Sequence, residues 1–225
     1  MSFLYMLAEN YREVLKNIEE AALKAGRNPE NIKLIAVTKT VGIDEVRQAA
    51  NLGMKDFGEN RVQDAAEKVI SLPDLNWHFI GHLQSNKVKD VLPYYMMIHS
   101  LDRLSLAKAV QSWAEKLDLL VNMLIQVNVS GEESKFGMKA DDLGSFINQI
   151  DDYDRIRVLG LMTMAPFVAD PEEARCCFKK LRQLRDEYSK PGMELPELSM
   201  GMTNDYLVAV EEGATILRIG SALFS

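Results

Sequence analysis

Short apolar segments alternate with helical patterns along most of the chain. Apolar residues recur at three- and four-residue steps from Phe3 to Ala22, which predicts an amphipathic helix ending near Gly26. From residue 32 onward, short apolar or β-branched runs are typical of buried strands. These predicted strands are Ile32–Thr38, Lys55–Gly58, Trp77–Gly81, Met96–His99, Met123–Val129, Val158–Thr163, Leu198–Met200 and Thr215–Ile219. Helical stretches between them begin near Ile43, Val62, Asn86, Arg103, Ala140, Pro171 and Asn204.

Regular alternation of strand and helix predicts a parallel sheet. Eight such units favour a closed (β/α)8 barrel, a TIM barrel, over an open doubly wound sheet, which also alternates strands with helices. No linker rich in Pro, Gly or Ser interrupts the alternation. We therefore expect a single domain over residues 1–225.

Composition and charge narrow the class of protein. The 225 residues are 47% hydrophobic and 26% charged, as in ordinary soluble proteins, and no apolar run is long enough to cross a membrane. The N-terminal segment lacks the pattern of a secretory signal, so we expect a cytoplasmic protein. A net charge of −7 argues against broad nucleic-acid binding. The adjacent Cys176 and Cys177 suit neither a disulfide framework nor a metal site and are expected to be reduced helix residues.

The first predicted strand, within "KLIAVTKT", ends on Lys39. Most lysines only solvate a surface, so an ordinary strand-end lysine is one interpretation. The other is an amine held in a pocket for carbonyl chemistry.

The functional groups of (β/α)8 barrels lie at the C-terminal ends of the strands and in the loops that follow, which we call the rim. Residues with useful chemistry crowd the predicted rim: Lys39, Glu59, Asn60, His82, His99, Ser100, Asn128, Ser130, Met162, Thr163, Ser199, Gly201, Thr203, Arg218, Gly220 and Ser221.

The loops after the last two strands indicate a phosphate site, although each could be an ordinary turn and cap. In "LSMGMTND", Gly201 permits a tight turn and Thr203 can cap a helix. In "LRIGSALF", Gly220 allows close approach of a ligand and Ser221 can cap the final helix. Arg218 must be paired with an acid or directed at a ligand acceptor. A lysine amine and a phosphate cradle on one rim suit a phosphorylated aldehyde.

Histidines and the second rim lysine give weaker signals. His78 and His82 would lie roughly 13 Å apart along a strand, too far to share an ion, so we expect no metal. His99 reads as a hydrogen-bonded rim residue or as an acid or base. Lys135, in "NVSGEESKFGM", reads as a solvated loop lysine.

Seven motifs in order make the chain resemble the YggS/PROSC family of pyridoxal-phosphate-binding homeostasis proteins. They are "LIAVTKT", "FGENRVQDAAEK", "WHFIGHLQSNK", "QVNVSGEESKFGM", "GLMTMAP", "LSMGMTND" and "LRIGSALF". The resemblance implies the fold of the N-terminal barrel of alanine racemase and the cofactor pyridoxal 5'-phosphate (PLP). By position, Lys39 resembles the lysine that forms the Schiff base, and Arg218 the arginine facing the pyridine nitrogen. Ser199, Gly201, Thr203, Gly220 and Ser221 resemble the phosphate site, and Asn60 lies in the "GEN" motif on the cofactor rim.

The resemblance also implies a role in PLP (vitamin B6) and amino-acid homeostasis without an established enzymatic activity. A guanidinium against the ring nitrogen disfavours its protonation and weakens the ring as an electron sink. We therefore expect a monomeric, non-catalytic carrier or buffer, with PLP-dependent apo-enzymes as the partners that receive the cofactor. The alternatives are a small racemase-like PLP enzyme and a cofactor-free lyase that uses Lys39 on a sugar phosphate.

Overall fold

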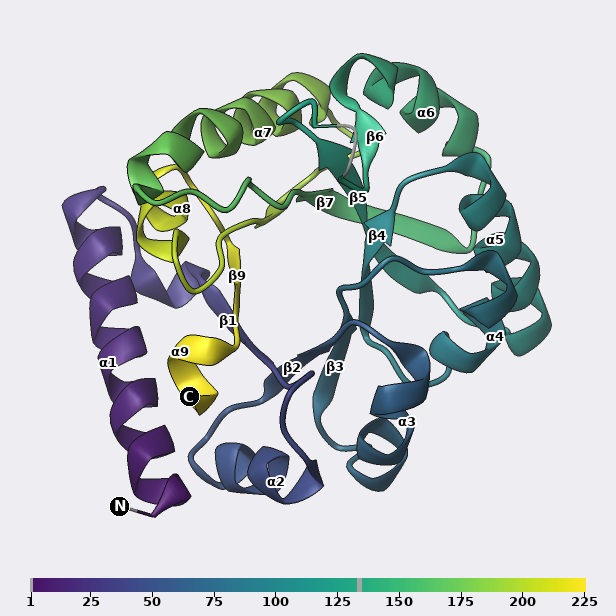
Figure 1. Cartoon of the computed structure of the whole chain (residues 1–225). Helices are drawn as coiled ribbons and strands as arrows, with labels where there is room; N and C mark the ends of the chain where they lie inside the picture. Colours follow the sequence, from purple (N-terminus) through teal and green to yellow (C-terminus); the bar gives the residue numbers. More distant parts are fainter. Residues whose placement is uncertain (1, 133–134) are drawn as a thin grey trace.

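A closed barrel of parallel strands forms the centre of the molecule in the computed structural model, which describes residues 2–132 and 135–225 (Figure 1). The strands of the barrel are β1 Lys33–Val37, β2 Asp56–Glu59, β3 Asn76–Phe79, β4 Met97–Leu101, β5 Val121–Asn128, β7 Ile156–Met162, β8 Glu197–Ser199 and β9 Ile216–Ile219. β1 pairs with both β2 and β9, and the β4–β5 pairing closes the ring. The predicted (β/α)8 barrel is confirmed, and the open sheet is wrong. A short strand that was not predicted, β6 Met138–Lys139, pairs with β5 outside the ring.

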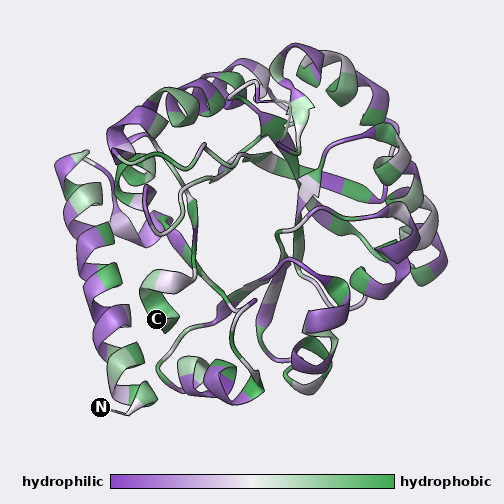
Figure 2. Ribbon diagram, viewed as in Figure 1, coloured by the Kyte–Doolittle hydropathy of each residue, from purple (hydrophilic) through white to green (hydrophobic). Residues whose placement is uncertain are grey.

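Helices surround the barrel, and each predicted helical stretch is present. They are α1 Phe3–Lys24, α2 Ile43–Asn51, α3 Val62–Ser71, α4 Val88–Val91, α5 Leu104–Leu117, α6 Leu143–Ile150, α7 Arg175–Tyr188, α8 Tyr206–Glu211 and α9 Ser221–Phe224. Short 3-10 turns at Pro29–Asn31, Ser85–Lys87, Ala140–Asp142 and Pro171–Ala174 complete the connections. The longer helices carry both polar and apolar residues, as expected for helices that pack one face on the barrel (Figure 2). Cys176 and Cys177 lie on α7 as free thiols.

The first helix packs against the C-terminal end of the chain. α1 ends at Lys24, as predicted from Gly26, and runs beside α8 and α9 (Figure 1). The Asn10 side-chain amide donates to the carbonyl of Leu223 at 3.0 Å, and the Asn17 amide donates to the Tyr206 hydroxyl at 3.2 Å. α1 therefore covers the last two helices of the barrel. None of the helices in the described ranges is long and apolar enough to cross a membrane.

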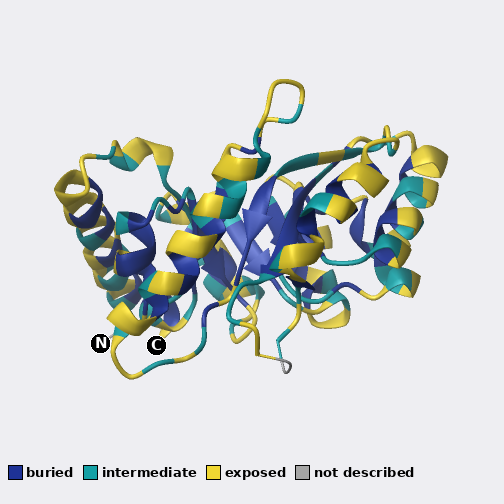
Figure 3. Ribbon diagram, turned by 90° about the horizontal axis from the view of Figure 1, so that it is seen from above, coloured by how far each residue is buried: buried dark blue, intermediate teal, exposed yellow. Residues whose placement is uncertain are grey.

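Successive side chains of a strand point to opposite faces of the sheet, so the buried residues fall into two groups. One set of strand side chains, such as Trp77 and Phe79, packs outward against the helices. The other set points into the barrel, where Ile35, Met97, Leu124, Met162 and Ile216 form a separate apolar cluster. Figure 3 shows that the strands are mostly buried, whereas the helices expose their outer faces. The barrel interior is thus a packed core with polar side chains among its members, including the buried His78, His99, Ser199 and Arg218.

Candidate functional site

The ends of β1 and β9 bring Lys39 beside the last loop of the barrel. β1 and β9 are neighbours, with Ala36 opposite Ile219 in the register. Lys39 follows β1 and is exposed. Gly220 follows β9, and a Cβ on it would lie 3.2 Å from the carbonyl oxygen of Val37. Lys39 and Gly220 therefore share one sector of the rim.

The two loops predicted to form a phosphate site contact each other. Thr203 Oγ1 accepts hydrogen bonds from Ser221 Oγ at 3.1 Å and from the Ala222 N–H at 3.3 Å. The backbone N–H of Arg218 donates to the carbonyl of Gly201 at 3.1 Å. Gly201 has a φ of +94°, and a Cβ there would lie 2.6 Å from Ala209 Cβ, so the turn requires glycine. The structure thus brings together Gly201, Thr203, Arg218, Gly220 and Ser221; their role toward phosphate stays a prediction.

Arg218 is a buried cation held by neutral acceptors. Its side chain donates from Nη1 to Ser199 Oγ at 2.6 Å and from Nη2 to the Thr163 carbonyl at 2.9 Å. Burial lowers the pKa of the Arg218 guanidinium to about 10, although the charge of Asp205 opposes this, so the group is positive at neutral pH. Across residues 2–132 and 135–225, no carboxylate pairs with it at ion-pair distance. A buried guanidinium with five N–H donors and two protein acceptors can give a hydrogen bond to a ligand.

Ser199 groups with Arg218 and with a buried histidine. Its hydroxyl is fully buried, and besides Arg218 its partner is His99 Nδ1 at 2.9 Å. His99 is hydrogen-bonded, as one interpretation of the sequence expected, but it is buried inside the barrel and not exposed at the rim. His78 occupies the same interior, whereas His82 lies outside it, stacked on Phe136.

Asn60 lies at the same rim, directly after β2, and is half-buried. The residue before it, Glu59, belongs to a buried cluster that the sequence analysis missed. Glu59 Oε1 accepts from Thr38 Oγ1 at 2.6 Å and pairs with Lys68 Nζ at 2.5 Å. The same ammonium donates to the carbonyls of Thr38 at 2.8 Å and Val41 at 3.1 Å.

This cluster supports the backbone on both sides of Lys39, because Lys68 contacts the carbonyls that precede and follow it. A signal for it existed in the sequence. Lys68 shares the buried face of α3 with Ala65 and Val69, and a lysine on an apolar helix face needs an acceptor.

The second rim lysine contributes an ordinary surface pair. Lys135 Nζ lies 3.9 Å from Glu132, three residues earlier. Glu133 and Ser134 of the predicted "QVNVSGEESKFGM" motif lie outside the described residues.

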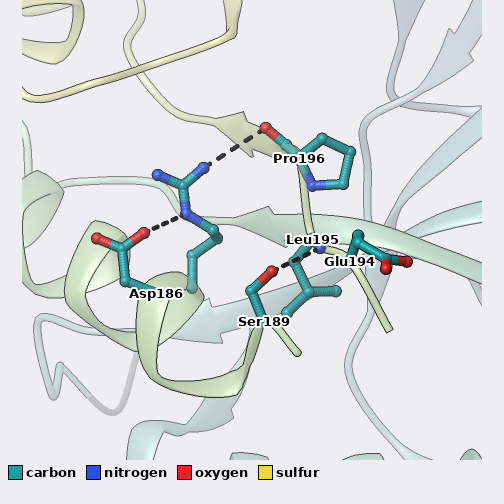
Figure 4. Close-up of a pocket in the computed structure, with 6 residues that line it drawn as sticks. Asp186, Ser189, Glu194, Leu195 and Pro196 are labelled. Atoms are coloured by element: carbon teal, nitrogen blue, oxygen red, sulfur yellow. Dashed lines mark hydrogen bonds and ion pairs between the residues drawn. The ribbon is translucent and has the colours of Figure 1, made fainter. Parts of the chain in front are cut away.

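A cavity of about 350 Å³ lies away from the predicted site residues (Figure 4). It is lined by Arg185, Asp186, Ser189, Glu194, Leu195 and Pro196. Its polar groups already have partners: Arg185 Nε donates to Asp186 at 2.6 Å, and Ser189 Oγ accepts from the Leu195 N–H at 3.1 Å. None of the residues predicted from the sequence lines it, so the rim around Lys39 is the candidate site.

The fold corresponds to a known class of barrel. Residues 10–225 match the family model described as "Alanine racemase, N-terminal domain". Alanine racemase from Corynebacterium glutamicum superposes with a TM-score of 0.71 at 14% identity, over 98% of this chain and 60% of that one, which shows a shared fold.

Closer relatives define the family. The chain is 45% identical over 219 residues to the pyridoxal phosphate homeostasis protein of Aquifex aeolicus, covering 96% of each sequence. The structure of PipY from Synechococcus elongatus with PLP bound has a TM-score of 0.84 at 33% identity, over 97% of this chain and all of that one. The chain belongs to the family of pyridoxal phosphate homeostasis proteins.

Proposed function

We propose that the chain binds pyridoxal 5'-phosphate through a Schiff base on Lys39 and acts in intracellular PLP and amino-acid homeostasis as a non-catalytic carrier or buffer. One observation carries this proposal. The exposed Lys39 lies beside the two loops after β8 and β9, where a turn requires Gly201 and where the hydroxyls of Thr203 and Ser221 meet. PLP supplies an aldehyde that condenses with a primary amine. Relatives named for PLP homeostasis and the PLP-bound PipY structure support the cofactor.

Each end of the cofactor has residues suited to it. Thr203, Ser221 and the backbone at Gly201 and Gly220 would hold the phosphate, since hydroxyls and unencumbered N–H groups are good anion donors. Arg218 would donate to the pyridine nitrogen. Asn60 would line the rim beside the ring. Residues 1–225 would then form one PLP-binding domain.

A carrier role follows from charge and exposure. A guanidinium opposite the ring nitrogen keeps that nitrogen unprotonated, which makes the ring a poorer electron sink for carbanion chemistry. Lys39 is exposed at the rim, so the linkage stays open to hydrolysis and to acceptor proteins. We infer a cytoplasmic monomer that exchanges PLP with PLP-dependent apo-enzymes. A racemase-like enzyme on the same rim is the competing function.

Absorbance before and after borohydride tests the linkage. We expect the purified chain with PLP to show a visible Schiff-base band that borohydride removes, because reduction converts the imine into a stable amine. Lys39→Ala should lose the band yet retain weaker, phosphate-dependent binding, because the phosphate would be held by other strand ends. Lys55→Ala is the matched control, since Lys55 is an exposed lysine just before β2, at the opposite end of the barrel.

Two outcomes would contradict the proposal. If Lys39→Ala and the parent bound PLP with equal affinity, Lys39 would not form a covalent link to it. If the parent turned over an amino acid steadily and Lys39→Ala did not, the function would be that of a racemase-like enzyme and not of a carrier.

A further inference from the structure

A continuous hydrogen-bond chain crosses the barrel interior from its far end to Arg218. Asp56 Oδ1 lies 3.0 Å from His78 Nε2, and His78 Nδ1 lies 3.1 Å from His99 Nε2. His99 Nδ1 lies 2.9 Å from Ser199 Oγ, which accepts from Arg218 at 2.6 Å. Asp56 is the first residue of β2, so this series of hydrogen bonds begins at the end of the barrel opposite the rim.

Chemistry assigns a direction to every bond in this chain. A carboxylate only accepts, so His78 donates to Asp56 from Nε2–H. A neutral imidazole then has Nδ1 as its acceptor, and His99 must donate to it from its own Nε2–H. His99 Nδ1 is left as an acceptor for the Ser199 hydroxyl. Arg218 has no acceptor, so it can only donate to Ser199.

Charge and burial agree with neutral histidines and an ionised acid. Burial would raise the pKa of Asp56, but the hydrogen bond from His78 and the charge of Lys33 outweigh it and hold that pKa below its ordinary value. Burial lowers the pKa of His78, and it lowers the pKa of His99 well below its usual range. The charged groups that act on the two imidazoles are Asp56 and Glu197 on one side and Lys33 and Arg218 on the other.

We propose that Asp56, His78 and His99 are positioning residues that commit the Ser199 hydroxyl to His99, so that Ser199 acts as the anchor of Arg218 at the ring end of the bound cofactor. This rests on the proposed function and refines it, because Ser199 then serves the pyridine end and the phosphate is left to Thr203 and Ser221. All the donors point toward Asp56, and hydrogen bonds aligned in this way strengthen one another. Removing Asp56 frees both imidazoles to change tautomer, and the Ser199 hydrogen is no longer committed.

Nitrogen-15 NMR of histidine-labelled protein without cofactor tests the direction of the chain. We expect both buried imidazoles of the parent to carry their proton on Nε2, with Nδ1 unprotonated. Asp56→Ala should move the ring resonances of His99 toward the other tautomer, although Asp56 contacts His78 and not His99. If that variant fails to fold, Asp56→Asn, which keeps an oxygen acceptor and loses the charge, should give a smaller shift of the same sign.

Ser100→Ala is the matched control for this measurement. Ser100 follows His99 directly, and its buried hydroxyl has no hydrogen-bond partner among the residues that the structure describes. We expect its removal to leave the tautomers unchanged. His99 resonances identical in the parent and in both Asp56 variants, or an Nδ1–H proton on His99 in the parent, would overturn the proposal.

A double-mutant cycle on the dissociation constant for PLP tests the effect on the cofactor. Asp56→Ala and Ser199→Ala should each weaken binding, by roughly two- to tenfold if one hydrogen bond to the Arg218 anchor is lost. The double variant should bind no more weakly than Ser199→Ala, because Asp56 acts through Ser199. Fully additive effects would overturn the proposal. A parent chain that does not bind PLP would instead refute the proposed function, and the NMR result would stand alone.

Discussion

Lys68 and Glu59 show how much one buried pair can matter near the candidate site. Both side chains are almost fully buried, and their contact spans α3 and the end of β2. Glu59 Oε2 has no hydrogen-bond partner within the described ranges, so the ammonium of Lys68 is the main compensation for this carboxylate. The pair therefore holds the turn that presents Lys39.

We predict that Lys68→Met destabilises the protein by about 3–5 kcal/mol, because it leaves an uncompensated buried carboxylate. Urea denaturation would measure the free energy of unfolding. The double variant Lys68→Met/Glu59→Gln should recover part of the loss. Lys24→Met is the control: it breaks the pair with Glu211, in which Lys24 is 76% exposed, and should cost no more than about 1 kcal/mol. Equal losses in Lys68→Met and Lys24→Met would show that the buried pair has no special weight.

At the scale of elements, the β8–α8 turn depends on the positive φ of Gly201 and on the lack of room for a side chain there. Gly201 follows β8, and α8 packs so closely that Ala209 occupies the position where a side chain would begin. Leu217 of β9 would lie 3.0 Å from the same Cβ. The predicted phosphate loop is therefore shaped by its neighbours as well as by its own residues.

Gly201→Ala and Gly53→Ala separate these two effects. Both glycines have a similar positive φ, +94° and +97°, but a Cβ on Gly53 would have no atom within 4 Å. We expect Gly53→Ala to cost about 1 kcal/mol from backbone strain alone. Gly201→Ala should cost a further 1–3 kcal/mol, approximately, from overpacking, and should weaken PLP binding. Equal losses in thermal or urea denaturation would contradict the steric argument.

At the scale of the whole molecule, the buried histidines couple stability to pH. The unfolded chain binds protons on these imidazoles near pH 6.5, whereas burial holds the pKa values of His78 and His99 lower in the folded chain. Below pH 6.5 the unfolded state therefore binds more protons, and acid favours unfolding. Asp56 and Glu197 reduce this effect at His78, while Lys33 adds to it at both rings and Arg218 at His99.

We predict that the free energy of unfolding falls between pH 7.5 and 5.5, by at most about 1.4 kcal/mol per pH unit for each histidine below pH 6.5. Urea denaturation at both pH values would measure it, above the range in which most carboxylates titrate. His99→Gln should show a smaller fall than the parent. A fall of the same size in both would assign the pH dependence to other groups.

The sequence by itself determined the barrel and most of the rim. Strand and helix periods are local properties, so the eight barrel strands and the helices between them could be identified from patterns of apolar residues. Lys39, Asn60, Gly201, Thr203, Gly220 and Ser221 could be placed at the rim because strand ends in a parallel barrel lie on one side. The resemblance supplied the cofactor expected there.

Only the tertiary structure decided which polar residues meet inside the molecule. Asp56, His78, His99, Ser199 and Arg218 come from five different strands, and their contacts depend on barrel closure and register. The Lys68–Glu59 pair likewise needs α3 to pack behind β2. Such contacts join residues far apart in the chain and leave no periodic trace in it. For that reason the placement of Ser199 beside Arg218 emerged only when the strands were brought together.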